Sequence, residues 1–270
     1  MTTPRSSRIP WSLVGMAVAA LAIAGAAGLW YLFFRPSGPP PVSLATLPPI
    51  AVQASPAAPA GSSATDPSAV ASPGATTGGG AGGSKAGIDG TWSIDPSIGS
   101  FSDFSGSWVG YRVQEQLATI GAQTAVGRTP NVTGTMSIQG TKVTAVDITA
   151  DLTSLQSDEA NRDRQLSHQA LETSQFPTAT FSLTQPIDLG SVPADGTTIN
   201  ETATGNLTLH GVTREVQVPL QARLDGSVIS IAGSLPIQFS DYDIQQPQAM
   251  IVLSVDDHGT MELQLHFTRS

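Results

Sequence analysis

Few side chains in the sequence have types and spacings that suit metal or acid–base chemistry. The four histidines are His168, His210, His258 and His266. They form neither an H-x-H pair nor an H-E-x-x-H motif, the spacings that place two imidazoles on one metal ion. The chain contains no cysteine, which excludes disulfides, thiolate metal sites and a cysteine nucleophile. We therefore predict no metal site and no cofactor, and we interpret His210, which precedes Gly211, as a turn or cap residue.

Acidic residues stand in pairs at 158–159, at 241 and 243, and at 256–257. None of these pairs has the spacing of a calcium-binding loop. The first pair suits the positive end of a helix, and the last precedes a glycine turn. A glycosidase needs two carboxylates that face each other across a cleft, and the sequence contains no G-x-S-x-G nucleophile elbow. We therefore predict that the protein is not an enzyme, and a lipid-modifying enzyme is kept as the third hypothesis.

Three arginines could bind the oxygens of a phosphate or carbonyl head group, because a guanidinium group presents a fork of N–H donors. They are Arg112, Arg128 and Arg214. The alternative interpretation is that each is a solvated arginine on a strand face, paired with a carboxylate.

The charge of the chain excludes some partners. The 270 residues include 12 Lys and Arg against 21 Asp and Glu, for a net charge of −9. Nucleic-acid binding without sequence preference needs a basic face, and docking on an anionic membrane surface needs a basic patch. We predict neither.

The N-terminal region contains a stretch that is long enough to cross a membrane. Residues 11–34 carry no charge, and as a helix they would span roughly 36 Å at about 1.5 Å per residue. Arg5 and Arg8 precede the stretch and Arg35 follows it, which favours a cytoplasmic N-terminus for residues 1–10. We predict a single-pass transmembrane anchor in the cell membrane, with the remainder extracytoplasmic. A cleaved signal peptide is the alternative, although its apolar region is usually shorter.

The next segment, residues 35–87, is mostly Pro, Gly, Ala, Ser and Thr and contains three charged residues, Arg35, Asp66 and Lys85. Such a composition cannot bury enough apolar surface to offset the entropy of ordering. We predict a flexible linker, with a mean reach of roughly 40 Å.

Residues 88–270 follow a period of two. Apolar residues alternate with polar ones over 132–139 and 146–152, and further such runs continue to 261–267. Each run is typical of a half-buried strand, and pairs such as Asp225-Gly226 between the runs are typical of tight turns. One polar stretch, 157–173, has helical spacing, with Ser157 or Asp158 as its cap. We predict an all-β fold, an antiparallel eight-stranded barrel with one short helical insertion.

Four motifs in this segment occur in the order of a known family. They are Trp92-Ser93-Ile94-Asp95, Arg162-Asp163-Arg164-Gln165-Leu166, Phe176-Pro177-Thr178-Ala179-Thr180-Phe181 and Leu207-Thr208-Leu209-His210-Gly211-Val212-Thr213-Arg214. With them, residues 90–268 resemble the YceI-like family of polyisoprenoid-binding proteins. The sequence departs from the family pattern at Ile98-Gly99, where a His-Ser pair is frequent, and at Ser240–Asp243, where an arginine is frequent.

The resemblance implies a lipocalin-like barrel with a long apolar tunnel. Members of the family are exported bacterial proteins that hold a polyprenyl chain, such as a quinone tail or a polyprenyl phosphate, and as a rule they do not catalyse a reaction. We therefore expect a membrane-tethered binding protein whose partner is an apolar lipid. A homodimer is left open.

The inward-facing residues of the strands would line the tunnel. The alternative is that they fill a solid core of a structural or interaction module. The predicted lining residues are Val109, Tyr111, Val113, Met136, Ile138, Val146, Ile148, Phe181, Leu183, Leu207, Leu209, Val216, Val218, Ile229, Ile231, Ile251, Leu253, Leu263 and Leu265.

Overall fold

The computed structural model describes residues 39–46, 87–118, 121–247 and 252–270. Twelve strands form one sheet within these residues. They are β1 (Gly90–Ile94), β2 (Trp108–Leu117), β3 (Gly121–Thr129), β4 (Val132–Gln139), β5 (Lys142–Asp151), β6 (Thr178–Leu183), β7 (Ile187–Asp188), β8 (Thr198–Leu209), β9 (Val212–Asp225), β10 (Val228–Gln238), β11 (Val252–Val255) and β12 (His258–Arg269).

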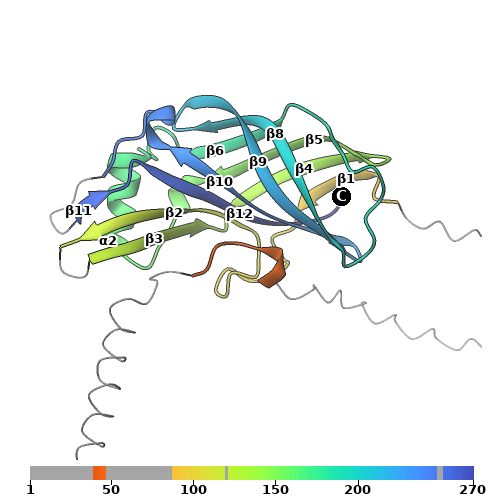
Figure 1. The fold of residues 1–270 in the computed structure, drawn as a ribbon, viewed down its shortest axis with the longest axis horizontal. Helices are drawn as coiled ribbons and strands as arrows, with labels where there is room; N and C mark the ends of the chain where they lie inside the picture. The colour runs from red at the N-terminus through yellow and green to blue at the C-terminus, as the bar shows by residue number, and fades with distance from the viewer. Residues whose placement is uncertain (1–38, 47–86, 119–120, 248–251) are drawn as a thin grey trace, which may run out of the picture.

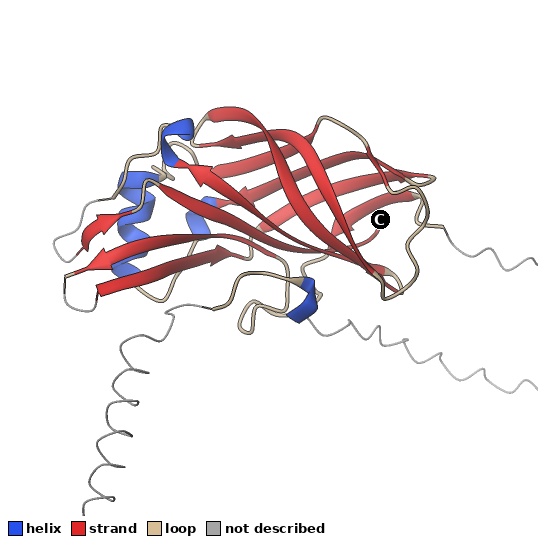
Figure 2. Ribbon diagram, in the orientation of Figure 1, coloured by secondary structure: helices blue, strands red, loops and turns tan. Residues whose placement is uncertain are grey.

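The helical elements are short. The α-helix α2 continues into the π-helical turn η3, and three 3-10 turns lie elsewhere in the chain (Figure 2). Their bounds are η1 (Leu44–Thr46), η2 (Leu152–Ser154), α2 (Ala160–Gln165), η3 (Leu166–Ala170) and η4 (Phe239–Tyr242).

The sheet closes into a barrel. The strand order is β1-β4-β5-β6-β8-β9-β10-β12, and β1 pairs with both β4 and β12, so these eight strands form a ring of antiparallel neighbours (Figure 1). Strand β2 pairs with β12, and β3 and β11 flank β2. The predicted all-β antiparallel barrel of eight strands with one short helix is confirmed.

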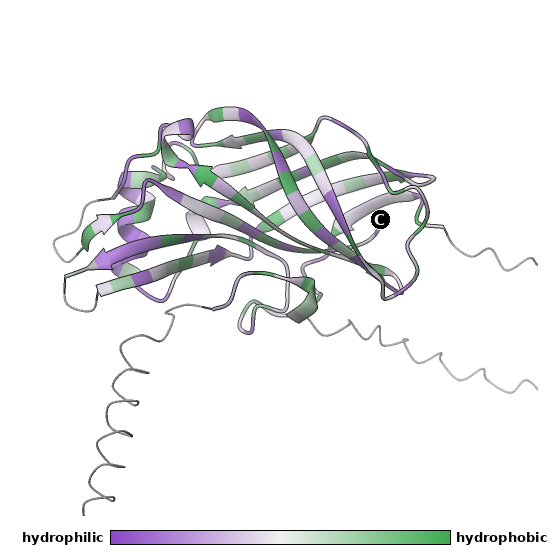
Figure 3. Ribbon diagram, viewed as in Figure 1, coloured by the Kyte–Doolittle hydropathy of each residue, from purple (hydrophilic) through white to green (hydrophobic). Residues whose placement is uncertain are grey.

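The strands form because apolar and polar residues alternate along them, as the hydropathy colours show (Figure 3). In β4, Val132, Met136 and Ile138 are buried, whereas Thr133 and Thr135 are exposed. Successive side chains of a strand point to opposite faces, so one face of each strand builds the barrel interior. The buried apolar residues form two clusters, one around Trp92 and Phe267 and the other around Leu207 and Tyr242.

The helical insertion is confirmed, but its cap differs from the predicted one. The helix α2 starts after Glu159, whose side chain accepts a hydrogen bond from the Asn161 N–H at 3.2 Å. Ser157, a predicted cap, instead donates its backbone N–H and its hydroxyl to the Asp163 carboxylate. The Glu159 bond satisfies one of the N–H groups that a helix start leaves without partners, and the Ser157 bonds tie the preceding residues to the helix.

Residues 39–46 lie against the outer wall of the barrel, and we call this segment the strap (Figure 1). Leu44 is 0% exposed. Its N–H donates to Gln221 Oε1 at 2.9 Å, and its carbonyl accepts from Arg223 Nη1 at 3.2 Å. The Pro39 carbonyl accepts from Arg112 Nη2 at 2.8 Å. This part of the predicted flexible linker is therefore packed on the barrel, which corrects the prediction for these residues.

The predicted anchor, residues 11–34, and the rest of the predicted linker lie outside the described residues. In the part of the chain that the structure describes, no helix has both the length and the apolar character needed to span a bilayer.

Candidate functional site

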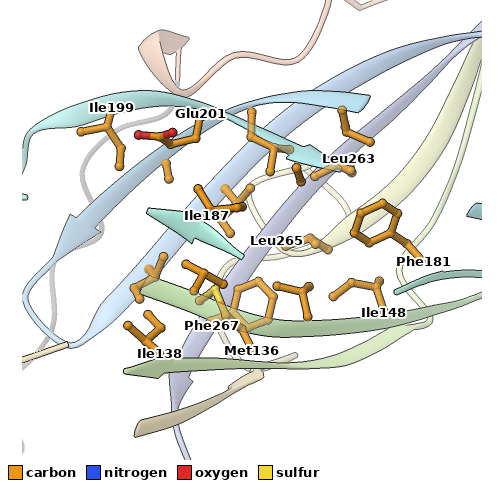
Figure 4. Close-up of a pocket in the computed structure, with 18 of the residues that line it drawn as sticks. Met136, Ile138, Ile148, Phe181, Ile187, Ile199, Glu201, Leu263, Leu265 and Phe267 are labelled. Carbon is orange, nitrogen blue, oxygen red and sulfur yellow. The ribbon is translucent and has the colours of Figure 1, made fainter. Parts of the chain in front are cut away.

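The barrel contains an apolar cavity of about 150 Å³, which we call the inner cavity (Figure 4). Isoleucine, leucine, valine, methionine and phenylalanine side chains from the barrel strands line it, among them Met136, Phe181 and Phe267. Polar residues at its wall are few. Arg223 directs its guanidinium group to Asp225 Oδ2, at 2.8 Å, and to the strap.

A second cavity, of about 620 Å³, adjoins the inner cavity. It lies at the end of the barrel where α2 and β11 are found (Figure 1), and we call it the helix-end cavity. Val109, Ala179 and Met261 line both cavities. The interior therefore has an apolar end and an end with polar residues in its wall.

The polar part of the helix-end cavity contains a buried ion pair. Arg162 Nη2 lies 2.6 Å from Glu115 Oε1, and Arg162 Nη1 lies 2.6 Å from Asp158 Oδ1. The Glu115 side chain is only 7% exposed. Burial alone would lower the pKa of Arg162, but its hydrogen bonds and attraction to Glu115 and Asp158 outweigh burial and raise it. The guanidinium group is therefore held in its charged form.

Tyr111 lies beside this pair. Its hydroxyl oxygen is buried and has no hydrogen-bond partner among the described residues, although Ser157 is nearby. Burial raises the pKa of Tyr111 well above its ordinary value of 10.0. The phenol is consequently neutral and has a proton to donate into the cavity.

Most predicted lining residues do line the interior. Val109, Tyr111, Val113 and Leu209 contact the helix-end cavity. Leu183 and Val216 pack against the two apolar clusters without lining a cavity, and Ile251 lies outside the described residues. The predicted residues that line the inner cavity are Val109, Met136, Ile138, Val146, Ile148, Phe181, Leu207, Val218, Ile229, Ile231, Leu263 and Leu265. Their contact with a lipid stays a prediction.

Leu253 corrects the prediction for β11. It is 67% exposed and lines neither cavity. The pairing of β11 with β2 shifts register between Val252 and Ser254, and Val252 and Val255 line the helix-end cavity instead. A bulge of this kind changes which residues face inward.

The three arginines predicted to bind a head group line neither cavity. Arg112 lies between the inward residues of β2 and therefore points outward, where its Nε is 3.2 Å from Glu262 Oε1. Arg128 packs over the Trp108 ring at 4.1 Å, and Arg214 Nε donates to the Asp241 carbonyl at 2.9 Å. The alternation of β2 thus places Arg112 outside the interior. Its pairing with Glu262 agrees with the alternative interpretation, an arginine on a strand face paired with a carboxylate.

The sequence prediction missed Glu115 and the role of Arg162. Glu115 has the same parity as Tyr111 and Val113 in β2, so the alternation could have placed it in the interior. Its partner is 47 residues away, and no local pattern reports such a pairing.

His210 is a turn residue, as predicted. It has a positive φ of 51° and is followed by Gly211 with φ of 76°. Its Nδ1 lies 3.0 Å from the Tyr242 carbonyl and its Nε2 lies 3.1 Å from Glu172 Oε2. A Cβ atom at Gly211 would overlap the Phe176 ring. Through His210, the turn between β8 and β9 contacts two neighbouring segments, one that contains Glu172 and one that contains Tyr242.

Within the described residues, no three His, Asp or Glu side chains gather as metal ligands would.

One curated relative and several solved structures are similar to this chain. A UPF0312 protein of Vibrio parahaemolyticus is 29% identical over 127 residues, which cover 44% of this chain and 60% of that relative. A solved polyisoprenoid binding domain from Saccharophagus degradans, implicated in plant cell wall breakdown, is 16% identical with a TM-score of 0.49, covering 66% of this chain and 98% of that one. BcnA of Burkholderia cenocepacia is 20% identical with a TM-score of 0.46, covering 66% and 99%.

The model of one protein family matches most of the barrel. The match spans residues 92–267, and it contains every strand of the closed ring in whole or in part. The chain therefore belongs to the YceI-like domain family.

Proposed function

We propose that this protein binds an isoprenoid or similar apolar lipid, with the tail in the inner cavity and the head group in the helix-end cavity. The observation that carries the proposal is a pair of adjoining cavities with three lining residues in common, one cavity apolar and the other with polar side chains in its wall. An isoprenoid tail offers no hydrogen bonds, so its binding follows the apolar area removed from water, at roughly 25 cal/mol per Å². This ligand class is also the one that the family resemblance implies.

The sizes of the cavities fit this division of roles. Ligand pockets are typically about 300–1,000 Å³, and the helix-end cavity lies in that range. The inner cavity is smaller, so a tail entering it would have to displace side chains such as those of Met136 and Leu265. The proposed role is binding rather than catalysis, which is what the family resemblance implies.

Extraction of the purified full-length protein tests the proposal. We expect organic extraction and mass spectrometry to recover a lipid in a stable ratio to protein. Met136→Trp fills the inner cavity and should abolish recovery, whereas Thr135→Trp, on the exposed face of the same strand, should leave it unchanged. Protein that never contains or takes up lipid contradicts the proposal.

A filled-core interaction module, the second candidate, gives the opposite result with the same variants. A solid core should be overpacked by Met136→Trp and lose about 1–3 kcal/mol of stability. A lipid tunnel should lose the ligand and keep the stability of the empty protein. Urea unfolding of lipid-free protein separates the two functions.

We also propose that residues 11–34 anchor the protein in the cell membrane and that the barrel is extracytoplasmic. The uncharged length of this stretch and the arginines before it support the proposal. A tethered binding site meets membrane lipids at high effective concentration. We expect the protein to resist carbonate extraction and the barrel to be digested by protease added outside the cytoplasmic membrane. A mature chain beginning after residue 34 would instead indicate a cleaved signal peptide.

A further inference from the structure

The wall of the helix-end cavity carries more negative than positive charge. Glu115, Asp158 and Glu159 contribute three carboxylates, and Arg162 is the one cationic side chain among the described residues that line the cavity. Asp163, whose carboxylate is held by Ser157, lies just behind the wall. An anion entering this end would therefore meet a net repulsive field.

Both terminal nitrogens of Arg162 are already paired with carboxylates. Its two terminal nitrogens lie 2.6 Å from Glu115 and 2.6 Å from Asp158. If Arg162 moved to a ligand phosphate, the buried Glu115 carboxylate would lose its partner beside a second anion. Leaving a buried charge without its partner is strongly unfavourable, so the ion pair opposes phosphate binding rather than assisting it.

Among the described residues, Arg162 is the one arginine that lines this cavity. Arg112 and Arg128 belong to strands that border this cavity, but Arg112 is paired with Glu262 on the outer face. Arg128 packs over the rings of Phe104 and Trp108, with its guanidinium carbon 4.2 and 4.1 Å from their centroids. Neither lines the cavity.

The Tyr111 hydroxyl supplies a donor that does not require a charged ligand. It is buried, and among the described residues no group is at hydrogen-bond distance from it, although Ser157 is nearby. A buried polar group in that state gains when a ligand oxygen accepts from it. A neutral phenol can donate to the carbonyl of a quinone or to the oxygen of an alcohol.

We propose that the helix-end cavity selects a lipid with an uncharged oxygen-containing head group and discriminates against a phosphate. The proposal rests on the lipid-binding function proposed above and narrows its ligand class. Of the two ligand types that the family resemblance implies, it favours the quinone type over the polyprenyl phosphate type. The buried Glu115–Arg162 pair excludes the anion, and Tyr111 positions the neutral head group.

Two probes with the same tail test the proposal. Geranylgeraniol and geranylgeranyl phosphate are titrated separately into the lipid-free full chain in a non-ionic detergent, and tryptophan fluorescence follows binding. We expect the alcohol to bind at least about tenfold more tightly, a difference of about 1.4 kcal/mol.

Variants assign the selectivity to named residues. Glu115→Gln removes a negative charge and frees Arg162, so the phosphate should bind more tightly. The ratio of the alcohol affinity to the phosphate affinity should then become smaller. Tyr111→Phe should weaken the alcohol several-fold and leave the phosphate nearly unchanged. Glu215→Gln makes the same charge change at an exposed site on β9 and should leave the ratio as it is.

The outcomes separate this inference from the proposed function. Equal or tighter binding of the phosphate overturns the inference while lipid binding stands. If neither probe binds, the proposed function itself fails. If each lipid binds but Glu115→Gln leaves the ratio of their affinities unchanged, the role given to the Glu115–Arg162 pair is contradicted.

Discussion

His266 is a titratable residue buried on the outer face of β12, and it holds a loop against the barrel. Its Nδ1 accepts from the Ser230 hydroxyl at 3.0 Å, and its Nε2 lies 2.9 Å from the Ser105 carbonyl. Since a carbonyl only accepts, Nε2 carries a proton, and in the neutral ring Nδ1 is the acceptor for Ser230. The loop that contains Ser105 connects β1 to β2 and covers this part of the wall.

Stability should therefore fall in mild acid. Burial lowers the pKa of His266 below its ordinary value of 6.5, so the unfolded chain takes up a proton at a higher pH than the folded chain does. The stabilisation is present in full above pH 6.5 and is lost as the pH falls toward the folded pKa. Each pKa unit between the unfolded and the folded value corresponds to about 1.4 kcal/mol of the free energy of unfolding. Urea unfolding should give a smaller free energy of unfolding at pH 5.5 than at pH 7.5. In His266→Gln the difference between the two pH values should be smaller.

His258 provides a control of opposite sign. It is exposed, and its hydrogen bond to Asp257 raises its pKa. A raised pKa contributes stability at low pH that is lost as the pH rises. In His258→Gln, the loss of stability between pH 7.5 and pH 5.5 should therefore be unchanged or slightly larger. A wild-type protein with equal stability at both pH values would contradict the assignment to His266.

At the scale of elements, strand periodicity predicted the barrel because a period of two decides which side chains face inward. The same parity places Tyr111 and Val113 inside and Arg112 outside. The alternation predicts the wrong face for Leu253, because a bulge in β11 shifts the register and no residue pattern in the sequence indicates the bulge. It also cannot report Glu115 with Arg162, since that pair forms only when α2 covers the end of the barrel.

The strap was not predictable for a different reason. Its one buried apolar side chain, Leu44, stands in a Pro- and Ala-rich stretch with no periodic pattern. Its position depends on acceptors and donors from β9 and β12, chiefly Gln221, Arg223 and Glu262. Composition describes average behaviour and misses a single docked residue.

Leu44→Asp should release the strap without unfolding the barrel. A charge cannot replace a fully buried leucine without a partner, and the strap can detach as a local unit. We expect hydrogen exchange at the Val42 and Leu44 amides to accelerate at least tenfold, while the melting temperature changes by only a few degrees. Ala45→Asp, at an exposed position of the strap, is the matched control. Unchanged exchange in the Leu44 variant would show that the strap is held by other contacts.

At the scale of the whole molecule, one strand explains why the two cavities differ. Residues 267–269 of β12 pair with β1, whereas residues 260–264 pair with β2. The wall thus closes directly at one end and widens at the other, where β2, β3, β11 and α2 surround the helix-end cavity (Figure 1). The narrow apolar end suits a tail, and the wide end leaves room for a head group.

The strap also determines how far the barrel can lie from the proposed anchor. Five peptide steps join residue 34 to residue 39, which is at most roughly 18 Å of extended chain. A free linker of residues 35–87 would instead have a mean reach of roughly 40 Å. With the strap docked, the connection from the proposed anchor to the barrel ends at residue 39, so the length of residues 47–86 does not set this distance.

Energy transfer in liposomes distinguishes these two arrangements. The chain has no cysteine, so Gln217→Cys, at an exposed position on β9, gives a single labelling site for a donor, with acceptors on the lipid head groups. Deleting twenty residues from within 50–80 should leave transfer unchanged, because the strap carries the connection. Leu44→Asp should reduce transfer, because the barrel then moves on the longer linker. If the deletion raises transfer and Leu44→Asp has no effect, the barrel is held by a free linker and the strap does not set its distance from the bilayer.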